Sequence, residues 1–160
     1  MKKLIALALC ALPYVAFAGD VSDVPEPIII KKQTVSHLPK ELYDGWWVTY
    51  DTDNHVSYAM RFYLENGKVQ GEHHSFDCSD KTLIEQDTFQ LTPTAKKGFN
   101  LQFNNQSDFA SYMNFSAISP KTFLLANQSF GNDEMVKMFP HGMNWIYLHS
   151  DVLTAKCPNS

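Results

Sequence analysis

The densest group of side chains that could do chemistry is Glu72-His73-His74, followed by Asp77 and Cys78. Imidazole and carboxylate groups are ligands for zinc and other transition metals. Because neighbouring residues of a β-strand point to opposite faces, only Glu72 and His74 of the first three would share a face. A metal site would then need a further histidine brought in by the fold. We favour the simpler interpretation of a polar, exposed strand, and we predict neither a metal nor a cofactor.

A second candidate is His149, which shares one face of the last expected strand with Trp145 and Tyr147. A histidine that enters a barrel can ligate haem iron. More often such a histidine is the hydrogen-bonding partner of a tyrosine or a carboxylate. Metal or haem binding centred on His74 or His149 is therefore an alternative that ranks behind the hypotheses below.

The sequence contains no motif typical of nucleophilic or acid–base catalysis. The serines form no G-x-S-x-G elbow, which is the usual setting of a nucleophilic serine in α/β-hydrolases. Cys78 and Cys157 are better explained as a bridge than as thiolate nucleophiles. Acids such as Glu65, Glu85 and Asp87 occur by chance in any acidic chain, so we predict that the protein is not an enzyme.

The N-terminus is typical of a bacterial secretory signal peptide, over residues 1–18. Lys2 and Lys3 precede an apolar run over residues 4–15, and Ala16-Phe17-Ala18 fits a signal-peptidase site. The run is shorter than the roughly 20 apolar residues that a membrane-spanning helix needs. We therefore predict cleavage after Ala18 and a periplasmic or secreted protein that is not embedded in a membrane.

The chain has three cysteines, of which Cys10 would leave with the signal peptide. Cysteines of an exported protein most often pair, because the bacterial periplasm is kept oxidising. A disulfide between Cys78 and Cys157 is therefore the favoured expectation, beside two separate thiols or a bridge to another molecule.

The charge of the chain argues against a nucleic-acid partner. Cleavage would remove Lys2 and Lys3 and no acid, which takes the net charge from −4 to −6. Arg61 is the only arginine, so the sequence has no basic stripe that could neutralise phosphates.

From Gly45 onward apolar residues recur with period two, which predicts β-strands. The clearest case is residues 56–64, where apolar residues occupy every second position and so form one apolar face of the strand. Asn66-Gly67 follows and predicts a two-residue hairpin, because a type I′ turn needs positive φ at both central positions. One further strand is expected to begin at Trp46. The others cover residues 68–76, 82–91, 99–103, 109–115, 122–128 and 143–153.

These strands number about eight, and the loops between them are too short for crossover helices. We therefore expect an all-β fold, an antiparallel up-and-down barrel whose closure removes exposed sheet edges. Residues 132–139 have helical spacing and a capping-type Asn132, which predicts a short helix before the last strand. We expect residues 19–37 to form an arm or linker, in which residues 28–30 could dock as an edge strand, and residues 38–160 to form the barrel domain.

Residues 38–43 predict one helical turn, and Gly45-Trp46-Trp47 then opens the first barrel strand. This arrangement resembles the G-x-W start of the lipocalins and the wider calycin superfamily, over residues 38–157. The resemblance implies that Gly45 allows a tight turn into the barrel and that Trp47 packs across its closed end. A bridge between Cys78 and Cys157 is similar to the lipocalin disulfide that ties a mid-barrel strand to the C-terminal segment.

The interior of a barrel of about eight strands is filled by side chains or holds one small ligand. If the strand alternations align, a set of apolar side chains points into it and would bind that ligand: Tyr58, Met60, Phe62, Phe99, Leu101, Phe103, Met113, Phe115 and Phe123. A tightly packed core is the alternative explanation for the same residues. Met135, Met138 and Phe139 on the short helix could cap the mouth of the barrel.

We therefore expect a non-catalytic binding protein for a small hydrophobic or amphipathic ligand. The rival is a protein-interaction module such as a hydrolase inhibitor. The chain is similar in size and opening motif to small periplasmic barrels that inhibit proteases or lysozymes. Those proteins bind through a rim loop or an N-terminal arm, a role that residues 19–37 could fill.

Overall fold

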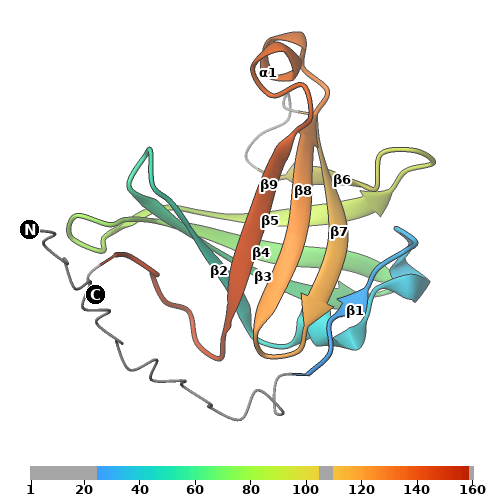
Figure 1. Ribbon diagram of the computed structural model, residues 1–160, viewed down its shortest axis with the longest axis horizontal. Coiled ribbons are helices and arrows are strands. Elements are labelled where there is room, and N and C mark those ends of the chain that lie inside the picture. Colours follow the sequence, from blue (N-terminus) through green and yellow to red (C-terminus); the bar gives the residue numbers. More distant parts are fainter. Residues whose placement is uncertain (1–24, 105–109, 159–160) are drawn as a thin grey trace, which may run out of the picture.

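The computed structural model describes residues 25–104 and 110–158, and these form an all-β protein. Strands β2 to β9 make one antiparallel sheet that closes where β2 pairs with β9 (Figure 1). This closed eight-stranded barrel, with one short helix near the C-terminus, confirms the predicted fold class. The predicted signal peptide lies outside the described residues. The elements are β1 (Ile28–Ile29), η2 (Val35–His37), η3 (Lys40–Tyr43), β2 (Trp46–Asp51), β3 (Val56–Glu65), β4 (Lys68–Asp77), β5 (Leu83–Pro93), β6 (Phe99–Phe103), β7 (Ser111–Ser119), β8 (Phe123–Phe130), α1 (Asp133–Met138) and β9 (Met143–Ser150).

Hairpins join most neighbouring strands, as the turn residues predict. Asn66 and Gly67 both have positive φ, 51° and 73°, which confirms the expected turn between β3 and β4. Strand β7 continues to Ser119, beyond the predicted end at residue 115, through a register shift between Phe115 and Ala117. Strand β9 ends at Ser150 and not at residue 153, because the chain leaves the barrel there.

The closed end of the barrel is built around the glycine–tryptophan pair. Gly45 has φ +71°, and a Cβ there would lie 2.6 Å from the carbonyl oxygen of Ser150 and 2.7 Å from Nε2 of His149. Both the backbone conformation and the space therefore require glycine. Trp47 is fully buried, and its Nε1 donates to the carbonyl oxygen of Leu42, 2.9 Å away.

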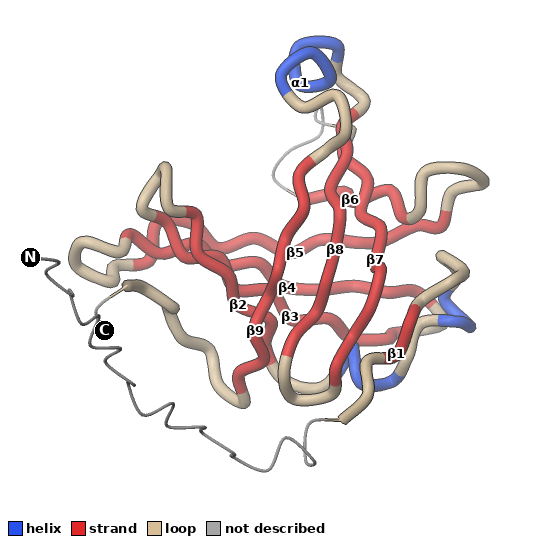
Figure 2. The backbone as a smooth tube through the Cα atoms, viewed as in Figure 1, coloured by secondary structure: helices blue, strands red, loops and turns tan. Residues whose placement is uncertain are grey.

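The described part of the N-terminal arm completes one side of β7. Strand β6 pairs with only the first part of β7, up to Met113, and β1 pairs with Ala117 and Ile118 further along (Figure 2). Between these two segments, the side-chain amide of Gln33 makes the hydrogen bonds to β7 that a neighbouring strand would make. Its Nε2 donates to the carbonyl oxygen of Phe115 at 2.7 Å, and its Oε1 accepts from the Phe115 amide at 3.1 Å. The edge of β7 is thus covered by residues that precede the barrel.

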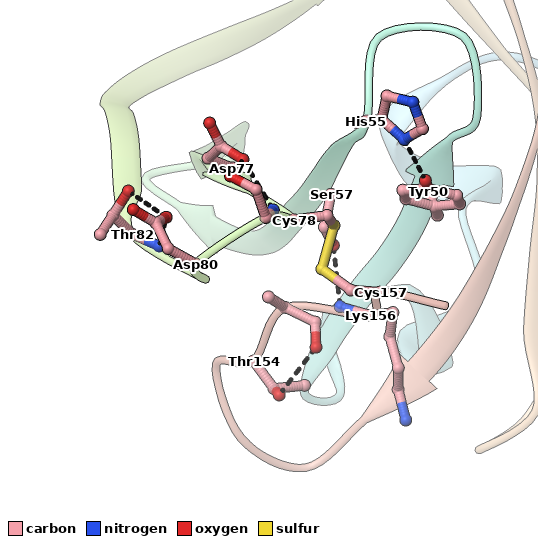
Figure 3. Close-up of a disulfide and its surroundings, with 12 residues drawn as sticks. Tyr50, His55, Ser57, Asp77, Cys78, Asp80, Thr82, Thr154, Lys156 and Cys157 are labelled. Atoms are coloured by element: carbon pink, nitrogen blue, oxygen red, sulfur yellow. Dashed lines mark hydrogen bonds between the residues drawn. A yellow bond between two sulfur atoms is a disulfide. The ribbon is translucent and has the colours of Figure 1, made fainter. Parts of the chain in front are cut away.

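A disulfide joins Cys78 to Cys157, as predicted, with the two Cα atoms 5.4 Å apart (Figure 3). Beside it, the amide of Lys156 donates to Oγ of Ser57 at 2.8 Å, so the C-terminal segment is held against β3. Disulfides persist in oxidising compartments, and this one indicates such a compartment.

The interior next to the closed end is filled by side chains. Phe62 makes edge-to-face contacts with Phe89 and Phe115, each with ring centroids 5.5 Å apart. Such contacts add about 0.5–1.5 kcal/mol to the stabilisation from burial. The other fully buried residues of this core include Trp47, Val69, Leu91, Phe99, Leu101, Met113, Ile118 and Leu124.

Candidate functional site

The opposite, open end of the barrel contains a pocket of about 360 Å³. This volume falls in the range of roughly 300–1,000 Å³ that is usual for small-molecule sites. Nine of the lining residues are aromatic or methionine: Tyr58, Met60, Phe103, Phe130, Met135, Phe139, Met143, Trp145 and Tyr147. The polar ones are Asp51, Asn54, His73, Glu85 and Gln128. The pocket is therefore mainly apolar, with a few polar groups in its wall.

Helix α1 stands over this end of the barrel, beyond the end of β8 (Figure 1). Asn132 caps the helix, since its Oδ1 accepts from the amide of Glu134 at 2.8 Å. Met135 and Phe139, one helical turn apart, both line the pocket, and the Phe139 ring packs against Phe130 at 5.9 Å. Met138, the third residue expected to cap the mouth, does not line the pocket and is 62% exposed.

Three rings from three strands form one wall of the pocket. Tyr58 of β3 stacks on His73 of β4, with ring centroids 5.6 Å apart and planes inclined by 26°. The edge of Trp145 of β9 meets Tyr58 at 5.9 Å, and its Nε1 donates to Oε1 of Gln128 at 3.2 Å. These contacts hold the flat faces of the wall in fixed positions around the pocket.

His73 is neutral at physiological pH. Burial, helped by repulsion from the His74 ring, lowers the pKa of His73 to about 4 and outweighs the opposing charge of Asp87. A neutral imidazole has one nitrogen that can accept a hydrogen bond. The pocket wall therefore presents an uncharged ring at this position.

Two tyrosine hydroxyls also belong to the pocket. Burial raises the pKa of Tyr147, and burial together with the charges of Asp51 and Glu85 raises that of Tyr58. Both phenols are protonated at neutral pH. Neither hydroxyl has a hydrogen-bond partner among the described residues, so both are available to a ligand.

The predicted ligand-binding residues separate into three groups. Tyr58, Met60 and Phe103 line the pocket. Five others are at most 1% exposed and belong to the filled core next to the closed end: Phe62, Phe99, Leu101, Met113 and Phe115. The expected interior position is wrong for Phe123, which pairs with the half-exposed Leu148, while the next residue along β8 points inward.

Several lining residues were missed by the sequence prediction. Trp145 and Tyr147 alternate along β9 and were placed on one face of it, and this alternation was the signal that could have assigned them to the interior. His73 was expected on an exposed strand. Asp51 and Glu85 come to the same pocket through the successive pairing of β2 with β3, β3 with β4 and β4 with β5.

The histidine pair of β4 divides between the two faces of the sheet. Glu72 and His74 share the outer face, as predicted, with Glu72 Oε2 3.7 Å from His74 Nε2. The expected exposure is wrong, because His73 is only 9% exposed and His74 only 5%. The Trp46 ring meets His74 at 5.1 Å and covers it, and neither ring nitrogen of His74 has a hydrogen-bond partner among the described residues.

Arg61 completes this outer cluster. Its Nη2 lies 2.6 Å from Oε1 of Glu72, and its guanidinium carbon lies 5.1 Å from the centroid of the Trp46 ring. Within the described residues, no group of three or more histidine, cysteine or acidic side chains is placed to hold a metal ion.

His149 lies at the closed end, away from the pocket. Its Nε2 is 2.9 Å from the carbonyl oxygen of Asp44, and its ring meets the edge of Trp47 at 5.2 Å. The hydrogen-bond partner is thus a backbone carbonyl and not the tyrosine or carboxylate expected.

The described part of the chain contains no helix with the length and apolar character needed to span a membrane. Comparison of the sequence with models of protein families gives no match, and comparison with curated proteins gives none either.

Proposed function

We propose that this chain is a non-catalytic, lipocalin-like binding protein that holds a small hydrophobic or amphipathic molecule at the open end of its barrel. It acts in the periplasm or outside the cell, after removal of residues 1–18. The disulfide between Cys78 and Cys157 supports this location, because such bridges persist in oxidising compartments.

The observation that carries the proposal is the composition of the pocket wall. Apolar and aromatic side chains with a few polar groups are typical of small-molecule sites. Here the aromatic wall contains the hydroxyls of Tyr58 and Tyr147, which have no hydrogen-bond partner among the described residues. Each of these hydroxyls can donate to and accept from a bound molecule, which adds polar contacts to the apolar ones of the wall.

The rival proposal, inhibition of a hydrolase through the N-terminal arm, has less support. Gln33, Ile28 and Ile29 are bound to β7, and Oγ of Ser119 donates to the carbonyl oxygen of Pro25 at 3.1 Å. A partner protein that used these arm groups would have to break their contacts with the barrel. Ligand binding in the pocket requires no such rearrangement.

The proposal is tested by blocking the pocket. Met143→Trp places a larger side chain at a lining position, whereas Ile146→Trp makes a similar change on the same strand at a residue that is 61% exposed. The neutral fluorescent probe N-phenylnaphthylamine should bind wild type and Ile146→Trp equally. We expect it to bind Met143→Trp at least about tenfold more weakly, a loss of about 1.4 kcal/mol. Equal binding by all three proteins, or none by wild type, would contradict the proposal.

Native mass spectrometry of the protein purified from a bacterial periplasm gives an independent test. A reproducible extra mass that leaves on denaturation would be the ligand itself. The denatured mass also reports whether the mature chain starts at Gly19 and carries the disulfide.

A further inference from the structure

Among the described residues, the charged side chains in the pocket wall all have one sign. They are the carboxylic acids Asp51 and Glu85. His73 is neutral there, since its pKa is about 4. No lysine or arginine is among the described residues that line the pocket. The site therefore presents negative charge beside an aromatic wall.

We propose that the ligand is a small organic cation, a protonated amine on an apolar body, whose ammonium group lies between Glu85 and Tyr58. This inference rests on the proposed function and adds the charge of the ligand. The apolar body would lie against Trp145, Phe103 and Met60.

The two carboxylates differ in how much of their hydrogen-bonding capacity is free. Asp51 accepts from the amides of Asp53 and Asn54, at 3.0 and 3.1 Å, and from Nδ2 of Asn54 at 2.8 Å. An ionised carboxylate has about four acceptor sites, so Asp51 is positioned by the turn and keeps capacity for a ligand. Glu85 has no hydrogen bond or ion pair within the described residues and is fully available.

Both carboxylates act on the same side chain. Burial raises the pKa of the Tyr58 hydroxyl most, and the charges of Asp51 and Glu85 raise it further. The negative charge of the pocket thus converges on Tyr58, which is also stacked on His73. A cation at this position would be near both carboxylates at once.

The remaining polar groups also suit an ammonium donor. The hydroxyl oxygens of Tyr58 and Tyr147 and one nitrogen of the neutral His73 can accept hydrogen bonds, and an ammonium group donates three. Tyrosine and tryptophan faces attract cations through their π-electrons. A ligand carboxylate would instead meet two like charges and no lysine or arginine among the lining residues.

Three compounds that share one apolar body test the sign of the charge: phenylbutylamine, phenylbutanol and phenylbutyrate. Their affinities for the full mature protein are measured by isothermal titration calorimetry. We expect the amine to bind about tenfold more tightly than the alcohol and the carboxylate more weakly than either. Raising the salt concentration from about 0.05 to 0.5 M should weaken the amine only, because screening acts on the charge.

Glu85→Gln and a matched control locate the effect. Glu85→Gln should weaken the amine about threefold and leave the alcohol unchanged, and the unchanged alcohol shows that the variant is folded. Glu65→Gln removes the same charge beside the β3–β4 turn, outside the pocket, and should change neither affinity.

An alcohol that binds as tightly as the amine, or an amine affinity unaffected by Glu85→Gln, would overturn the inference and leave the proposed function standing. If wild type binds neither the three compounds nor the neutral probe N-phenylnaphthylamine, both fail.

Discussion

Loss of the disulfide should destabilise the protein by about 4.5 kcal/mol. Cys78 and Cys157 are 79 residues apart in the sequence. In the chain-entropy model, a bridge that closes a loop of this length removes about 15 cal/mol/K from the unfolded chain, which gives about 4.5 kcal/mol at room temperature. The strand pairings of the barrel do not include either cysteine, so the folded barrel should survive without the bridge.

Urea unfolding followed by tryptophan fluorescence measures this difference. The variants are Cys78→Ala, Cys157→Ala and the double variant, compared with oxidised wild type. With a urea slope of about 2 kcal/mol/M, each midpoint should fall by about 2 M. All three should agree with one another and with reduced wild type, because losing either cysteine breaks the same bridge.

Two results would refute this reasoning. A loss below about 1.5 kcal/mol would mean that the bridge does not limit the unfolded chain as the loop length requires. A double variant much less stable than each single variant would mean that the cysteines stabilise the fold through separate contacts.

Two further predictions concern pH and the closed end. The pKa of His73, about 4, lies below its ordinary 6.5, so the unfolded chain takes up this proton first as the pH falls. The free energy of unfolding is therefore unaffected by His73 above about pH 6.5. It falls as the pH drops toward 4, by about 3 kcal/mol in total. Urea unfolding across this range should show a free energy of unfolding that depends less on pH in His73→Gln than in wild type. Equal pH dependence in the two proteins would contradict this prediction. At the closed end, Gly45→Ala and Gly67→Ala both strain a positive φ, but only Gly45 lacks space for a Cβ. Gly67→Ala should cost about 1 kcal/mol and Gly45→Ala at least about 3 kcal/mol by the same assay, and equal losses would contradict the role of the crowding.

The strands of this barrel were largely predictable because each has its own local signal. Period-two alternation located β3 and β6, and Asn66-Gly67 identified the turn between β3 and β4 by the φ values that it needs. The length of β7 was not predictable, because the register shift after Phe115 moves later residues out of phase with the earlier alternation.

The site was less predictable than the fold, since alternation shows which face a side chain occupies and not which end of the barrel is filled. Phe62 and Tyr58 belong to the same face of β3, yet one lies in the core and the other in the pocket. Phe123 was misplaced because Phe123-Leu124-Leu125 is apolar on both faces, so its phase is set only by pairing with β9. Glu85 reaches the pocket because Ser75 of β4 pairs with both Tyr58 and Glu85, a register that the sequence pattern does not specify.

The pairing of β2 with β9 has a consequence for the kinetics of folding. These are the first and last strands of the barrel, and closure joins Trp46 to Ser150 at opposite ends of the domain sequence. Contacts so far apart must overcome a large loop-closure entropy, which makes folding slow, on the order of milliseconds to seconds. The pocket takes walls from both β3 and β9, so it cannot form before the C-terminal strand is in place. A ligand therefore meets only the closed barrel, and by mass action it shifts the balance toward that state.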